Sequence, residues 1–171
     1  MRVIQITCHD LSLFFALGSN FISDKLIADR CRQEQIMAHL TWADEYSVGV
    51  KSIDGQHMKL FELYNKLYEA MLIGHTQDFT GKLLNELVKY THEHFQTEET
   101  MMAAAKYSGL DGHRAKHHEL THQVEEFLLK FQKGESMINL KLLHFLRDWL
   151  ITHIQHEDKE YGPSLQKSGV H

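Results

Sequence analysis

The sequence predicts an all-α protein, an antiparallel up-down-up-down four-helix bundle preceded by an irregular or partly helical amino-terminal extension. Apolar residues recur at steps of three and four along four stretches of about 20 residues, which is the period of one face of an α-helix. The single proline among the 171 residues is Pro163, so proline interrupts none of the earlier stretches. Short glycine-bearing breaks separate the stretches, which favours antiparallel neighbours.

The four expected helices are similar in length and each carries one apolar face. These faces run from Ile53 to Met71, from Leu84 to Ala105, from Leu110 to Phe131 and from Leu142 to Ile154. Breaks are expected at Gly74, between Gly109 and Gly112, and at Gly134, because glycine favours helix ends and turns. A helix of about 20 residues is about 30 Å long, so the four can pack along their full length.

Residues 1–39 form the expected extension, and residues 40–171 form the expected bundle domain. The apolar run at 11–17 is shorter than the roughly 20 residues that cross a bilayer, and polar residues before it depart from a secretory signal peptide. We therefore expect no membrane association. Because the sequence from Met37 onward reads like a natural beginning, a second hypothesis is that translation starts at Met37.

Composition excludes some functions and leaves histidine as the unusual residue. With 18 basic and 23 acidic residues the formal net charge is -5, which gives a nucleic-acid-binding surface no electrostatic support. Two cysteines, Cys8 and Cys31, are too few for a disulfide framework, so we expect a reducing, cytoplasmic location. The 14 histidines require another explanation.

Histidines lie in phase with the apolar residues of every expected helix. A buried imidazole needs a hydrogen-bond partner or a metal ion, and a buried carboxylate without a partner costs still more. One such histidine alone would be explained most simply by a hydrogen bond, but five in register with two carboxylates favour a metal site. The candidate metal ligands are His57, His94, Glu98, His113, His117, His153 and one carboxylate near the end of the fourth helix, Asp158 or Glu157.

The spacing of the candidate ligands supports their convergence on one site but does not decide between Asp158 and Glu157. His94 and Glu98 are four residues apart, as are His113 and His117, so each pair projects from one side of its helix. Glu157 lies four residues after His153, whereas the five-residue step to Asp158 corresponds to about 140° on an ideal helix. Seven donors are too many for one ion, and zinc or copper would favour fewer.

Three other histidines fail the same test. His118 and His122 share a polar line with Glu125 and Glu126, and His92 lies beside further polar residues. We expect these three side chains to face solvent.

The ligand segments resemble the hemerythrin family, in particular its single-domain bacterial members. The matching segments are Tyr46–His57, His94–Met102, His113–His117 and Trp149–Asp158, and the likeness covers about residues 40–161. In the family a histidine is followed five residues later by an aspartate, so the resemblance selects Asp158 over Glu157. It implies that His113, His117 and His153 bind one iron, that His57 and His94 bind the other, and that Glu98 and Asp158 bridge the two.

The resemblance also implies the chemistry of the site. Two non-haem irons with a bridging oxo or hydroxo group would leave one position open, on the iron with two histidines, where dioxygen binds reversibly. We expect an oxygen storage, transport or delivery protein and no enzyme, with Phe95, Trp149 and Leu150 as an apolar lining. The alternatives are a sensor of oxygen, redox state or iron that acts through a separate partner, and a di-iron enzyme acting on peroxide or nitric oxide.

Overall fold

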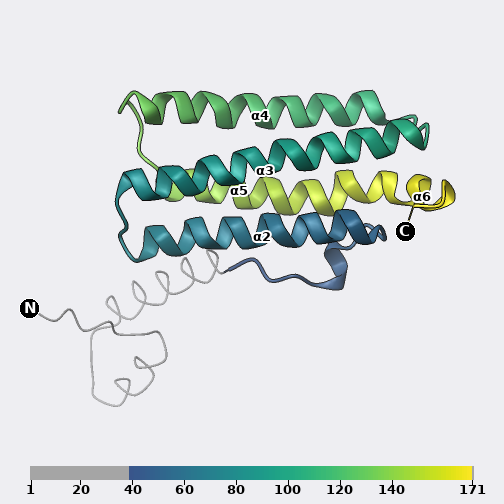
Figure 1. Ribbon diagram of the computed structural model, residues 1–171, viewed down its shortest axis with the longest axis horizontal. Helices are drawn as coiled ribbons and strands as arrows, with labels where there is room; N and C mark the ends of the chain where they lie inside the picture. The colour runs from purple at the N-terminus through teal and green to yellow at the C-terminus, as the bar shows by residue number, and fades with distance from the viewer. Residues whose placement is uncertain (1–38, 171) are drawn as a thin grey trace, which may run out of the picture. The chain divides into compact units, whose positions relative to one another are not determined.

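A computed structural model describes residues 39–170, in which four helices lie side by side and successive helices run in opposite directions (Figure 1). No strand occurs within this range. The elements are η2 (Asp44–Tyr46), α2 (Lys51–Leu72), α3 (Gln77–Ala104), α4 (Leu110–Gln132), α5 (Leu140–Thr152), the π-helical turn η3 (His153–Asp158) and α6 (Lys159–Lys167). The last three elements follow one another without a break and form the fourth helix. The predicted four-helix bundle is confirmed.

Two of the three predicted breaks fall at the expected glycines. Gly74 and Gly134 have φ angles of 77° and 72°, the left-handed conformation that glycine adopts without steric cost. The third break comes earlier than expected, because α4 already begins at Leu110 and Gly112 lies inside it. There the chain reverses through Lys106, whose φ is 53°.

Side chains fix the ends of several helices. The Thr76 hydroxyl caps α3 by accepting a hydrogen bond from the Phe79 amide at 3.3 Å, and the Asn139 side chain caps α5. Asp54, in the first turn of α2, accepts hydrogen bonds from the Ser47 hydroxyl and the Val48 amide. This carboxylate therefore holds the segment before α2 against the helix.

The fourth helix extends well beyond the apolar face predicted to end at Ile154. It continues through η3 and α6 to Lys167, with Pro163 inside α6. Tyr161 and Leu165 of α6 are fully buried and belong to an apolar cluster with Ile53 of α2 and Met102 of α3. This cluster closes the end of the bundle at which the candidate site lies.

The expected extension over residues 1–39 and the hypothesis of a start at Met37 lie outside the described residues, apart from His39. Within residues 39–170, no helix combines the length and the apolar character that a membrane crossing needs.

Candidate metal centre

All four helices contribute to one buried cluster of histidines and carboxylates. α2 supplies one side chain, α3 and α4 supply two each, and the two ends of η3 supply the last two. The structure brings together the seven side chains expected from sequence and resemblance, each at most 5% exposed: His57, His94, Glu98, His113, His117, His153 and Asp158. Their donor atoms form two groups, each with all atoms within 4.8 Å of one another, and Glu98 and Asp158 belong to both groups.

The two oxygens of Glu98 face different histidines. Oε1 lies 3.6 Å from His57 Nε2 and 3.4 Å from His94 Nε2. Oε2 lies 3.2 Å from His117 Nε2 and 3.8 Å from His113 Nε2. One oxygen is therefore presented to each group, which is how a carboxylate bridges two cations.

Asp158 divides its oxygens in the same way. Oδ2 lies 3.1 Å from His57 Nε2, whereas Oδ1 lies 3.0 Å from His153 Nε2 and 3.4 Å from His113 Nε2. The two carboxylates thus separate a group of three histidines from a group of two.

The π-helical turn explains why Asp158 rather than Glu157 reaches this cluster. A π-turn closes i→i+5 hydrogen bonds, so residues five apart, such as His153 and Asp158, come onto one side of the helix. Glu157 instead lies partly exposed and pairs with Lys116 of α4. The helical period left both residues open, and the backbone decides between them.

Several buried polar atoms in the cluster lack any hydrogen-bond partner. These atoms are both ring nitrogens of His57, His113 Nε2, Glu98 Oε2 and both oxygens of Asp158. In addition, His117 Nε2 and His153 Nε2 face each other at 3.1 Å. No lysine or arginine pairs with either carboxylate in the described range 39–170. Because buried polar groups are normally satisfied, converging lone pairs and two buried negative charges fit a site for cations.

Burial and the two carboxylates shift the pKa values of three of the imidazoles, those of His57, His94 and His153. Burial lowers the pKa of His94 to about 4 and also lowers the pKa of His153, which keeps both rings neutral, the form that binds metal. Burial acts in the same direction on His57, but the carboxylates of Asp158 and Glu98 outweigh it and raise the pKa of His57 to about 9. Burial opposes ionisation of Glu98, yet the surrounding imidazoles, His94 foremost, hold its pKa well below the usual range.

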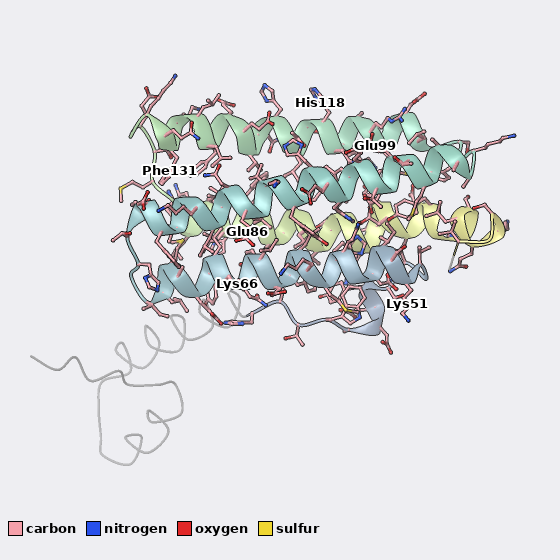
Figure 2. All side chains as sticks on the ribbon, in the orientation of Figure 1. Lys51, Lys66, Glu86, Glu99, His118 and Phe131 are labelled. Atoms are coloured by element: carbon pink, nitrogen blue, oxygen red, sulfur yellow. The ribbon has the colours of Figure 1, made fainter. Side chains whose placement is uncertain are left out.

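Two of the imidazoles are held from behind by different partners. His94 Nδ1 donates to the amide oxygen of Gln56 at 2.9 Å, a neutral acceptor. His117 Nδ1 donates to the carboxylate of Glu99 at 3.0 Å, and Arg114 donates to the other oxygen of Glu99 at 3.1 Å. Glu99 lies at the boundary between α3 and α4 (Figure 2). Such partners fix the tautomer and orientation of a ligand histidine.

Tyr161 supplies the one hydroxyl that reaches the cluster within the described part of the chain. Its phenol donates a short hydrogen bond to Glu98 Oε1, and both side chains are fully buried. Burial raises the pKa of Tyr161 well above 10, so the phenol keeps its proton. Tyr161, Gln56 and Glu99 were not predicted from the sequence. Extending the buried face of the fourth helix past Asp158 would have pointed to Tyr161, whereas the other two carry no such signal.

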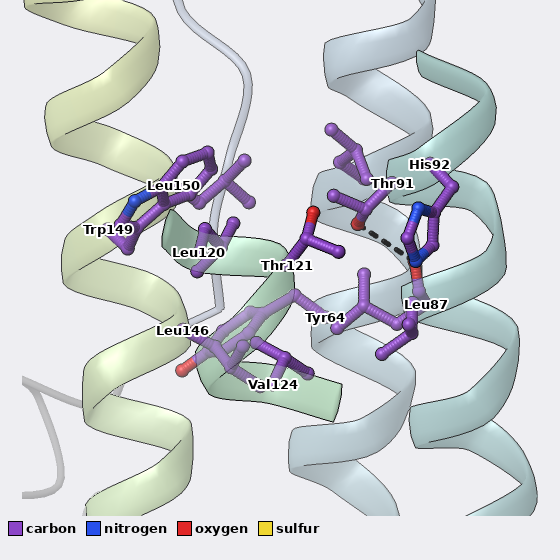
Figure 3. Close-up of a pocket in the computed structure, with 12 residues that line it drawn as sticks. Tyr64, Leu87, Thr91, His92, Leu120, Thr121, Val124, Leu146, Trp149 and Leu150 are labelled. Atoms are coloured by element: carbon purple, nitrogen blue, oxygen red, sulfur yellow. Dashed lines mark hydrogen bonds between the residues drawn. The ribbon is translucent and has the colours of Figure 1, made fainter. Parts of the chain in front are cut away.

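Aromatic rings cover one side of the cluster. Phe95 stacks on His117, with ring centroids 3.6 Å apart and planes 6° apart, and Trp149 stacks on His153 at 4.2 Å and 16°. Beside them, Trp149 and Leu150 line an apolar cavity of about 40 Å³ to which all four helices contribute (Figure 3). Phe95 and Trp149, two of the three residues expected to line the site, thus pack on histidines of the group of three, and Leu150 lines the neighbouring cavity.

The three histidines expected at the surface are exposed. His118 points outward from α4 (Figure 2), His122 is exposed one turn later, and His92 lies 3.3 Å from Glu125.

Comparisons with known proteins agree with this site. Residues 48–165 match the family profile described as the hemerythrin HHE cation binding domain. The chain is 38% identical to the bacteriohemerythrin of Methylococcus capsulatus over 130 residues, which is 75% of this chain and 98% of that protein. It is 35% identical to the bacteriohemerythrin of Pseudomonas aeruginosa over 77% of this chain and 85% of that protein. A crystal structure of wild-type hemerythrin, 36% identical, superposes with a TM-score of 0.72 over 75% of this chain and 98% of that one.

Proposed function

The chain belongs to the hemerythrin family, and from that premise we propose that its buried cluster holds two iron ions and binds dioxygen reversibly. The single observation that carries the proposal is the division of both bridging carboxylates between a group of three histidines and a group of two. When bound, a ferrous pair supplies the two electrons that reversible dioxygen uptake requires.

The proposed ligands follow from this division. His113, His117 and His153 would hold one iron and His57 and His94 the other, with Glu98 and Asp158 shared. A bridging oxo or hydroxo group would complete the centre. In support, each carboxylate has one oxygen within 3.6 Å of a nitrogen in the group of two and one within 3.2 Å of a nitrogen in the group of three.

The donor set favours binding over catalysis. Di-iron bundles that activate oxygen typically use four glutamates and two Glu-x-x-His pairs. Here five imidazoles, which bind metal as uncharged ligands, accompany two carboxylates, and fewer anionic ligands stabilise highly oxidised iron less. We therefore propose storage, transport or delivery of oxygen, with no turnover of peroxide or nitric oxide.

The protein's own residues protect and orient the site. Phe95 and Trp149 cover His117 and His153, and Leu150 lies against the neighbouring cavity, so bulk water is kept away. Tyr161 holds a proton at Glu98 Oε1 and fixes the rotation of that carboxylate.

The test combines metal analysis with a reversible absorption change. We expect two irons per chain, and a charge-transfer band that appears when the ferrous protein meets air and disappears under argon. His117→Ala should lose metal and the band, whereas His118→Ala, one residue away but exposed, should retain both. A band that bleaches irreversibly after one exposure, or steady consumption of peroxide or nitric oxide, would contradict the proposal.

A further inference from the structure

A surface cleft reaches the outer side of the metal centre. It lies between α4 and the fourth helix, has a volume of about 590 Å³, and is lined at its inner side by Trp149 and His153. The Nε2 atom of His153 faces the centre, 3.0 Å from Asp158 Oδ1. One imidazole therefore separates the cleft from the bridging carboxylate.

Aromatic contacts connect the cleft to the group of three histidines. Trp149, which is partly exposed, stacks nearly parallel on His153 at 4.2 Å. The ring centroids of Trp149 and Phe95 are 5.7 Å apart, and Phe95 stacks on His117 with ring centroids 3.6 Å apart. Electron transfer weakens steeply with distance and is helped by stacked π systems. The indole thus offers the cleft a short electronic path to two imidazoles of the same group.

Carboxylates predominate around the cleft. Glu119, Asp148 and Glu157 line it together with one cation, Lys116. Lys116 pairs with Glu157, and Arg147 pairs with Asp148 at 2.7 Å. Glu119 receives only an amide hydrogen bond, from Gln123 at 3.3 Å. The chain as a whole also carries a formal net charge of -5, so the cleft favours a positively charged binding partner.

We infer that this cleft is the docking site for a cationic one-electron donor, and that Trp149 and His153 carry the electron to the oxidised centre. The inference rests on the proposed function, because a ferrous oxygen carrier that becomes oxidised must be reduced before it binds oxygen again. In each encounter the donor loses one electron and one ferric ion becomes ferrous. Two donors reduce the pair, and no bond in the protein forms or breaks.

The first test measures the rate at which hexaammineruthenium(II) reduces the oxidised, iron-loaded protein, followed by stopped-flow absorption. We expect Trp149→Leu to lower the second-order rate constant by about an order of magnitude, and Trp149→Phe, which keeps a ring in the stack, to lower it less. The matched control is Phe145→Leu, which removes an aromatic ring from the wall of the same cleft without removing a ring that stacks on a ligand histidine. Equal rates for Trp149→Leu and the unaltered protein, with both irons retained, would overturn the inference.

The second test reverses the charge of one residue that lines the cleft, without changing a buried side chain. Glu119→Lys should slow reduction by hexaammineruthenium(II) about fivefold at low ionic strength, as expected for a charge about 10 Å away in water, and should speed reduction by the anionic ferrous EDTA complex. Glu86→Lys makes the same change in net charge on the exposed face of α3 (Figure 2). It should change the rates of reduction by both complexes much less than Glu119→Lys does. Equal effects of the two substitutions would place docking elsewhere.

A third readout does not depend on reduction. Hexaamminecobalt(III), a complex of similar size and positive charge, should shift the indole nitrogen–proton NMR signal of Trp149 and leave that of Trp42 in place. Protein that holds no iron would contradict the proposed function itself. Protein that holds two irons and binds oxygen reversibly, but shows an unmoved Trp149 signal and an unchanged rate in Trp149→Leu, would contradict only the docking inference.

Discussion

Replacing Glu99 by glutamine should loosen one iron of the proposed pair and leave the other in place. Glutamine keeps an oxygen that can accept from His117 Nδ1, which lies 3.0 Å from the carboxylate, but removes the negative charge. Loss of such an outer partner typically lowers metal affinity by about 10- to 100-fold. Because Glu99 is 26% exposed and Arg114 already neutralises part of its charge, we expect the lower end, about tenfold or about 1.4 kcal/mol.

The assay is a graded chelator titration of the iron-loaded protein, with iron per chain counted at each step. Glu99→Gln should pass through a plateau near one iron, because only the ion held by His117 is weakened. Gln56→Leu removes the acceptor of His94 Nδ1 and should weaken the other ion. The control is Glu93→Gln, also on α3, whose exposed carboxylate lies 4.0 Å from Lys89.

Two results would refute this reasoning. If Glu99→Gln and the unaltered protein lose both ions at the same chelator concentration, Glu99 does not support the metal through His117. If the double variant Glu99→Gln/Gln56→Leu still shows a plateau near one iron, both substitutions loosen the same ion and the division of the histidines into groups of three and two is wrong.

Three further predictions concern the core of the centre. Tyr161→Phe should lower the free energy of unfolding in urea by about 1.5–3 kcal/mol, the range for a hydrogen bond to a charged group. Tyr64→Phe removes a buried hydroxyl that has no partner, so it should cost little, and equal losses would contradict the role of Tyr161. Asp158→Asn should lose metal in iron analysis, whereas Glu157→Gln should retain both ions; the reverse would favour Glu157 as the ligand. A site is stabilised by about 4 kcal/mol when the free metal concentration is a thousand times the dissociation constant of the site. Removing the metal with a chelator should therefore lower the free energy of unfolding by about 4 kcal/mol for each such site. An unchanged melting temperature after verified metal loss would contradict this.

The bundle could be predicted because its signals are local and repeated. Leu60, Leu67, Leu84 and Leu120, at helical spacing in their stretches, are all buried in the structure. Histidines in phase with such residues could be recognised because burial leaves an imidazole few partners. The helical period alone therefore indicates which histidines converge in the interior.

The supporting residues could not be predicted, because their roles arise from contacts between helices. Gln56 and Glu99 are polar residues next to candidate ligands, and nothing local distinguishes them from solvent-facing neighbours. Only the packing of α2 against α3, and of α4 against α3, brings them behind His94 and His117. The period of a single helix contains no information about such pairs.

The π-helical turn matters beyond the choice of one carboxylate. On a continuous α-helix, Asp158, Tyr161 and Leu165 would lie roughly 90° around the axis from Leu146, Leu150 and His153. The wider turn of η3 takes up one additional residue, worth about 100°, and brings both sets onto the buried side. The same backbone irregularity therefore places the Asp158 carboxylate between the two groups of histidines, together with Tyr161 and the apolar closure at Leu165. A further one-residue insertion within η3 should rotate all three away together by about 100°, so that the protein loses iron and the α6 end loses stability in urea. A one-residue deletion should instead leave a continuous α-helix with all three on the buried side, and Asp158→Asn should remove the iron and leave Tyr161 and Leu165 packed.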